Sequence, residues 1–129
     1  MTDEPHGTLT VRTLAMPADT NPAGDIFGGW VMSQMDIAGG IAAFERARGR
    51  VVTVAVDSMT FISPVKVGDV LCIYCTISKV GKTSITVDIE AYARRNRISD
   101  RVKVTEGSFI YVALDDDGKP RPVEPKVVA

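Results

Sequence analysis

The chain has 129 residues, a length that suits one domain able to bury its own core without disulfide or metal staples. Apolar residues make up 45% and charged residues 24%, as in an ordinary soluble globular protein. A formal net charge of -1 excludes a general attraction to polyanions. We therefore expect neither nucleic acid nor a membrane as partner, and any anionic ligand must be held by a local basic patch.

Residues 1–7 are polar and acidic, and they contain no apolar segment of the kind found in a secretory signal. The sequence also lacks a run of about 18 apolar residues, the length needed to cross a bilayer. These features predict a disordered lead over residues 1–7 and a cytoplasmic location.

The next part of the chain predicts a strand, a loop and one long helix. Residues 8–14 alternate apolar and polar side chains, as strands do, and a loop rich in Pro, Asn, Asp and Gly follows. Residues 28–48 carry small and apolar side chains at helical spacing. We expect Asp25 or a neighbour to cap this helix and Gly49 to end it. The helix is apolar nearly all round, so we also expect it to be closely wrapped.

Four strand-like segments come after the helix, at residues 51–62, 69–80, 84–94 and 102–114. A long antiparallel sheet must bury one face, and the apolar helix is the available filler. The sequence therefore predicts an α+β fold in which an antiparallel sheet of about five strands wraps around one long central helix. This domain would span residues 8–116, with an irregular C-terminal tail over 117–129.

The two cysteines, Cys72 and Cys75, have a C-x-x-C spacing but lie in one of the predicted strands. Side chains three residues apart in a strand point to opposite faces, so these thiols cannot converge on one metal ion. His6 is the only histidine, and it lies in the lead. We expect core packing for both cysteines and no metal site.

Asp36 is the first candidate for chemistry, because it interrupts the apolar helix with no Lys or Arg within one turn. Gly39 and Gly40 lie one turn further along, and each costs the helix about 1 kcal/mol relative to alanine. That cost is expected where a ligand or another backbone must approach closely. An aspartate on a solvent-facing stripe would give the same pattern, and this alternative stays open.

The second candidate is the glycine-bearing loop that leads into the helix, with Gly28 and Gly29 at its end. Free N–H groups and the positive end of the helix dipole suit a developing oxyanion there. Asp36 lies about 11 Å further along the same helix, so a symmetric dimer could bring it to the partner's loop. A loop without any function remains the alternative.

Basic residues gather around the connection before the last predicted strand, and Arg94 and Arg95 are the candidates among them for binding phosphates. A sheet edge protected by charge is the alternative. Other chemistries are excluded, because the sequence has no histidine to activate a Ser or Cys nucleophile, no G-x-S-x-G motif and no metal-ligand cluster. If the protein is an enzyme, its base or nucleophile is a carboxylate.

The sequence resembles the YciA-type acyl-CoA thioesterases, which are hotdog-fold acyl-CoA hydrolases. The resemblance covers about residues 8–116 and is densest in the block that runs from Leu14 to Asp36. It continues through residues 49–59, 61–64, 67–70 and 79–85.

The resemblance implies a hotdog fold and hydrolysis of fatty acyl-CoA to CoA and free acid, with broad chain-length tolerance. No cofactor is implied, since CoA is part of the substrate. The family's catalytic aspartate falls on Asp36, and an asparagine paired with it across the dimer falls on Asn21. The amide thought to polarise the thioester carbonyl falls at Gly28 and Gly29.

The family also implies a place for the CoA and an assembly. A segment near the pantetheine arm of CoA falls on the hairpin Gly81, Lys82, Thr83 and Ser84. Relatives carry arginine where this chain has Lys82; both are cations, but their contact geometry differs. Members form dimers of hotdogs, commonly assembled as trimers of dimers.

Two other functions fit the same fold. A hotdog dehydratase or hydratase would need a histidine with a carboxylate, and His6 lies outside the predicted domain. A non-catalytic acyl-CoA-binding sensor or assembly module is the other alternative. The presence of both Asn21 and Asp36 argues against the sensor, and a thioesterase assay would decide.

Overall fold

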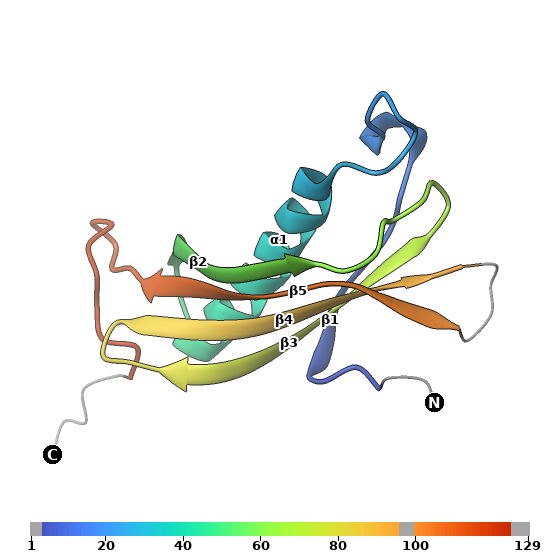
Figure 1. Cartoon of the computed structure of the whole chain (residues 1–129). Helices are drawn as coiled ribbons and strands as arrows, with labels where there is room; N and C mark the ends of the chain where they lie inside the picture. Colours follow the sequence, from blue (N-terminus) through green and yellow to red (C-terminus); the bar gives the residue numbers. More distant parts are fainter. Residues whose placement is uncertain (1–3, 96–99, 125–129) are drawn as a thin grey trace, which may run out of the picture.

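The computed structural model describes residues 4–95 and 100–124, which form one helix and a sheet (Figure 1). Loops and a 3-10 turn at Pro17–Asp19 join the main elements. In chain order, these elements are β1 (Thr8–Leu14), α1 (Gly28–Ala47), β2 (Val51–Phe61), β3 (Val70–Val80), β4 (Ser84–Arg94) and β5 (Arg101–Ala113).

The sheet has five antiparallel strands in the order β1-β3-β4-β5-β2. Strands β3, β4 and β5 follow one another as neighbours, while β2 pairs with the far side of β5, so β1 and β2 are the two edges. The sheet curls past α1, which crosses one of its faces (Figure 1). The predicted α+β class and hotdog arrangement are confirmed, and each strand boundary lies within one residue of its prediction.

The core lies between α1 and the concave face of the sheet. The helix contributes Val31, Met35, Ala38 and Ala43, all nearly inaccessible to solvent. Alternate residues of the central strands pack against these helix side chains, because successive strand side chains point to opposite faces of the sheet. The strand side of the core includes Leu71, Ile73, Ile85, Val87, Ile89, Val104, Phe109 and Tyr111.

The opposite face of the helix is not covered within one chain. Ile37, Ile41 and Phe44 follow one another at helical spacing, and their side chains are 52%, 40% and 51% exposed. Within the single chain, the sheet therefore wraps one face of the helix and leaves this face open. An apolar stripe of this kind usually marks an interaction surface.

The start of the helix differs from the prediction. Phe27 is the N-cap residue and no side chain caps the first turn. Asp25 instead forms an ion pair with Lys66, at 2.5 Å between Oδ1 and Nζ. Pairing with a cation has displaced the capping role, so the first-turn N–H groups have no acidic side chain on them.

The end of the helix also differs. The left-handed residue is Arg48, with a φ of 56°, rather than Gly49. A Cβ added to Gly49 would lie 2.7 Å from Nη2 of Arg121. That guanidinium donates a hydrogen bond to the backbone oxygen of Ala47 at 2.9 Å. Gly49 therefore serves to admit the arginine that satisfies a terminal helix carbonyl.

The two ends of the described chain contact the sheet. The backbone N–H of His6 donates to Glu90 at 2.9 Å, and that of Val123 donates to the Lys82 oxygen at 2.8 Å. His6 thus contacts β4, and the segment after β5 is irregular but anchored. The rest of the predicted lead and tail, residues 1–3 and 125–129, lies outside the described residues.

Cys72 and Cys75 are both buried free thiols on β3. Cys75 belongs to the core beneath α1, and burial raises the pKa of its thiol. Across residues 4–95 and 100–124, no group of three His, Cys, Asp or Glu side chains is placed to hold a metal ion. Among the described residues, no helix is both long and apolar enough to span a membrane.

The helix end yields a stability prediction. Arg48→Gly should raise the free energy of unfolding by about 1 kcal/mol, because glycine adopts the left-handed conformation without the Cβ clash. Gly49→Ala should lower it by a similar amount, since Arg121 must move away from the Ala47 carbonyl. Urea unfolding of both variants checks the pair. A gain from Gly49→Ala would contradict the assignment.

Candidate active site

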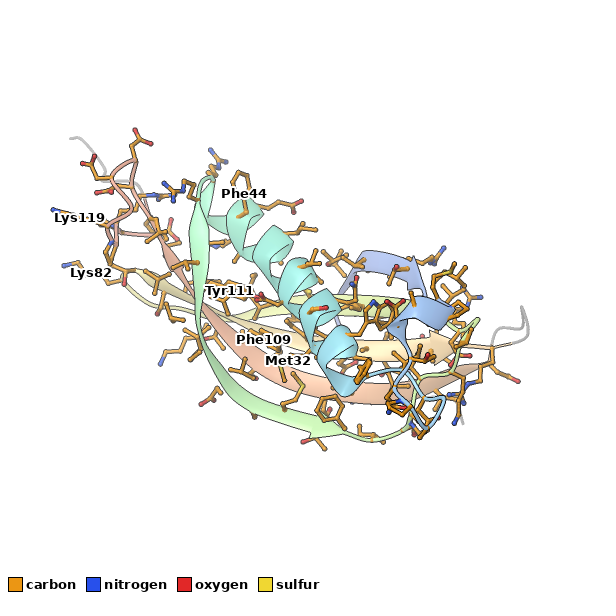
Figure 2. All side chains as sticks on the ribbon, turned by 90° about the horizontal axis from the view of Figure 1, so that it is seen from above. Met32, Phe44, Lys82, Phe109, Tyr111 and Lys119 are labelled. Carbon is orange, nitrogen blue, oxygen red and sulfur yellow. The ribbon has the colours of Figure 1, made fainter. Side chains whose placement is uncertain are left out.

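The carboxylate of Asp36 lies where α1 meets the sheet. The Thr53 hydroxyl on β2 donates to Asp36 Oδ1 at 2.6 Å. The Tyr111 hydroxyl on β5 reaches the same Oδ1 at 3.0 Å and the Asp36 backbone oxygen at 3.0 Å. Figure 2 shows Tyr111 extending from the sheet toward the helix. Asp36 therefore belongs to a three-element cluster and not to a free solvent-facing stripe.

The Tyr111 hydroxyl is a proton donor at neutral pH. Burial of the phenol and the charge of the nearby Asp36 carboxylate raise the pKa of Tyr111 above its ordinary value of 10.0. Both effects disfavour the phenolate, one by loss of hydration and the other by like-charge repulsion. The tyrosine thus keeps its proton, which the Asp36 carboxylate and backbone oxygen share.

Gly39 explains how a tyrosine fits so close to the helix. A Cβ added to Gly39 would lie 2.2 Å from the Tyr111 hydroxyl oxygen and 2.8 Å from Cδ1 of Ile89. At Gly40 the nearest Tyr111 atom would lie at an ordinary 3.9 Å. A close approach was expected from a ligand or a backbone, but a side chain makes it. Only the first of the two glycines is needed for it.

Asn21 shapes its own loop. Its side-chain Oδ1 accepts hydrogen bonds from the backbone N–H groups of Ala23 and Asp25, at 3.0 and 3.1 Å. Its backbone N–H donates to the Asp25 oxygen at 2.7 Å. Within the single chain, no hydrogen bond joins Asn21 to Asp36 among the described residues.

Gly28 and Gly29 form the first turn of α1. Trp30 and Val31 donate their N–H groups to the Phe27 oxygen, whereas the amides of the two glycines have no acceptor within the described part of the chain. The Phe61 ring would lie 3.3 Å from a Cβ added to Gly28, while the space beside Gly29 is open. Two free N–H groups at the positive end of a helix can stabilise an oxyanion.

The two candidate CoA-binding sets lie far apart in one chain. The hairpin Gly81–Ser84 leads into β4, and Arg94 is the last residue of that strand. An 11-residue strand is about 33 Å long, so Lys82 and Arg94 cannot hold the same phosphate within one subunit. Figure 2 places Lys82 at the Phe44 end of the helix, away from Met32.

Two residues of the predicted basic patch, Arg95 and Lys103, are already paired, and Arg97 of that patch lies outside the described residues. Arg95 binds the Asp69 carboxylate at 2.9 Å and the Pro64 oxygen at 2.7 Å, and Asp69 is buried. Lys103 contacts Glu106 at 2.6 Å. Arg94 and Arg95 both line an open groove of about 680 Å³, with Arg12 and Lys66 among the other residues. Arg95 is held by Asp69, whereas Arg94 forms no ion pair with the described residues, so Arg94 is freer to bind an anion.

Thr53 and Tyr111 were missed by sequence reasoning. Tyr111 alternates with Phe109 along a strand whose inner face is apolar, and a buried tyrosine hydroxyl needs a partner. Asp36 was the one acidic residue in the interior of the helix opposite, so this pairing had a detectable signal. Thr53 had none, because nothing local distinguishes it from other strand threonines.

Comparisons with known proteins identify the family of this chain. The sequence model described as the Thioesterase superfamily matches residues 23–99, which is more than half of the chain. The chain belongs to the thioesterase superfamily. The acyl-CoA thioester hydrolase YciA of Salmonella typhimurium is 59% identical over 126 residues, 95% of either chain. The predicted membership of the YciA-type thioesterases is thereby confirmed.

Solved structures support the same relationship. A hexameric thioesterase from Yersinia pestis is 57% identical, with a TM-score of 0.90 over 95% of this chain and 100% of its own. A hexameric hotdog-fold thioesterase of Campylobacter jejuni is 43% identical, with a TM-score of 0.86 over 92% of this chain and 91% of its own. The thioesterase described here therefore corresponds to nearly the full length of these relatives.

The paired state of Arg95 in this thioesterase gives a second prediction. Arg95→Ala leaves the buried Asp69 carboxylate without its cation and should cost about 2 kcal/mol of stability. The matched variant Arg94→Ala should change stability by less than about 0.5 kcal/mol. Denaturant unfolding of both proteins tests the contrast. Equal losses in the free energy of unfolding would show that the contact between Arg95 and Asp69 does not stabilise the protein.

Proposed function

We propose that this thioesterase hydrolyses fatty acyl-CoA to free CoA and fatty acid, with Asp36 as the catalytic carboxylate. The single observation that carries the assignment is the carboxylate held by two hydroxyls, Thr53 and Tyr111, on an otherwise apolar helix. The hydrolase activity is that of the curated relatives. No cofactor enters the proposal, because a carboxylate and water suffice for the chemistry.

Two routes use this carboxylate. As general base, Asp36 takes a proton from water while the water oxygen bonds to the thioester carbonyl carbon; the C–S bond then breaks and the proton passes to the CoA thiolate. As nucleophile, Asp36 bonds to that carbon and expels the thiolate, and water cleaves the resulting anhydride. Label found in Asp36 after a single turnover in oxygen-labelled water would identify the nucleophile route, in which water attacks the aspartyl carbonyl of the anhydride.

The carbonyl oxygen would be met by a free amide at Gly28 or Gly29, and Asn21 would orient the water or the carbonyl. Along one helix these glycines lie about 11 Å from Asp36, too far to act on one small bond. We therefore place each site between two subunits, with Asp36 from one and the glycine turn from the other. The oxygen of the Asn21 side chain holds the loop, while its amide nitrogen bonds to none of the described residues.

The exposed apolar surface supports a dimer. Ile37, Ile41 and Phe44 line the open face of α1, and the edge strand β2 adds Val52, Val54 and Val56, each more than 40% exposed. A long apolar edge strand attracts another strand unless it is covered. The Thr53–Asp36 hydrogen bond ties this edge to the helix, so a partner would cover both beside the carboxylate.

The proposal also covers three further properties: the assembly beyond the dimer, the residues that bind CoA, and the location in the cell. Solved relatives are described as hexamers, and we propose a trimer of dimers. Lys82 and Arg94 are the proposed cations for CoA, each from its own end of β4. Gly81, Thr83 and Ser84 would line the pantetheine arm. A cytoplasmic location fits two free buried thiols.

The catalytic assignment is tested by Asp36→Asn. Hydrolysis should fall by about 10²- to 10⁴-fold, because the variant loses the base or nucleophile but keeps the side-chain shape. Release of CoA thiol from palmitoyl-CoA, followed with a thiol reagent, measures it. CoA binding and assembly should stay close to wild type. Near-normal turnover would overturn the assignment, and tight binding of palmitoyl-CoA without turnover by the wild-type protein would favour the acyl-CoA sensor.

The assembly is tested by Val54→Lys, which places a charge on the exposed edge of β2. We expect smaller oligomers and lower hydrolysis, since a charge on an edge strand blocks strand pairing. Light scattering after gel filtration should give six times 13.9 kDa for the wild-type protein. Asp116→Lys, in an exposed turn, is the control and should leave the mass unchanged. An unaltered hexamer in Val54→Lys would exclude β2 from the interface.

A further inference from the structure

We infer that Tyr111 is a positioning residue that fixes Asp36 with its Oδ1 occupied, which leaves Oδ2 as the oxygen that reacts. This inference rests on the proposed role of Asp36 and specifies how the carboxylate is held. It gives a role to the buried Tyr111 and to Gly39, which makes room for the tyrosine hydroxyl.

The hydrogen bonds are distributed unequally between the two carboxylate oxygens. Oδ1 accepts from Thr53 at 2.6 Å and from Tyr111 at 3.0 Å. Oδ2 accepts no hydrogen bond from the residues that the structure describes. An oxygen that already accepts two hydroxyl donors is a weaker base and nucleophile, so the reacting lone pair is that of Oδ2.

The tyrosine also fixes the direction in which Oδ2 points. Its hydroxyl lies 3.0 Å from both the backbone oxygen and Oδ1 of Asp36, so it ties the side chain to the helix backbone of the same residue. The ring itself is held by packing, since Tyr111 is 1% exposed and stacks near Phe109 at 6.5 Å between centroids. A rigid donor of this kind limits rotation of the carboxylate, and correct orientation is a large part of catalysis.

Gly39 is part of the same arrangement. Any Cβ at this position would lie 2.2 Å from the Tyr111 hydroxyl oxygen, well inside van der Waals contact. An interior glycine destabilises the helix, but at this position it makes room for the Tyr111 hydroxyl. Tyr92 supplies a natural comparison, because it is also a buried tyrosine that donates to a carboxylate, Glu90, at 3.0 Å.

Tyr111→Phe tests the inference, because it removes the hydroxyl and keeps the ring. We expect kcat for palmitoyl-CoA to fall about 10- to 100-fold, the loss that follows removal of one hydrogen bond to a charged group. KM should stay within about 2-fold, since the hydroxyl acts on Asp36 and not on the substrate. Tyr92→Phe, which loses the hydroxyl bonded to Glu90, should retain the wild-type kcat. A wild-type kcat in Tyr111→Phe would overturn the inference.

A second variant tests whether the Tyr111 hydroxyl acts on kcat through the space that Gly39 leaves for it. Gly39→Ala displaces the Tyr111 hydroxyl and should lower kcat by a similar factor, and the double variant Gly39→Ala/Tyr111→Phe should be no slower than the worse single variant. Multiplied losses in the double variant would contradict a shared path through the hydroxyl. Circular dichroism and gel filtration confirm that each variant is folded and assembled before its kinetics are compared.

The outcomes also separate this inference from the proposed function. An active Asp36→Asn protein would reject the catalytic role proposed for Asp36, and the positioning role of Tyr111 with it. An inactive Asp36→Asn protein together with a fully active Tyr111→Phe protein would leave the thioesterase assignment intact and reject only the positioning role.

Discussion

A carboxylate on an apolar helix must find polar partners, and this requirement shapes the middle of the molecule. Asp36 finds them on two different strands, Thr53 on β2 and Tyr111 on β5. Those strands are adjacent in the sheet, where Thr53 and Tyr111 are direct register partners. The position of the helix over the sheet, the pairing of β2 with β5 and the presence of Gly39 together bring these two hydroxyls to Asp36.

Polar burial serves two purposes in this fold. At the Asp69 corner, Oδ2 of a buried carboxylate accepts from the Arg95 guanidinium and from the backbone N–H of Lys66 at 2.8 Å, and these contacts close a loop. At Asp36, Oδ1 also accepts two donors, but both are neutral hydroxyls, and no cation pairs with this carboxylate among the described residues. A carboxylate paired with a cation contributes to structure, whereas one held by neutral hydroxyls keeps the capacity to react.

The strands were predictable because their side chains alternate strongly and their turns are short, so β1 and β4 begin and end where the pattern placed them. The start of the helix was not predictable. Asp25 pairs with Lys66 instead of capping the helix, and Lys66 lies in a loop 41 residues away. Tyr111 is an intermediate case, because the sequence signals that its buried hydroxyl needs a partner but does not fix the contact. Its distance from Asp36 in sequence is 75 residues, and the contact arises only after β2, β5 and α1 have been placed together.

The location of Thr53 on an edge strand has a metabolic consequence. Under the proposed pairing of β2 with a second copy, the residue that holds the catalytic carboxylate sits on the strand that meets the partner. An unassembled chain would then carry an incomplete site and leave cellular thioesters untouched. Activity would become a property of subunit concentration, switched on as newly made chains find one another and lost again on dilution.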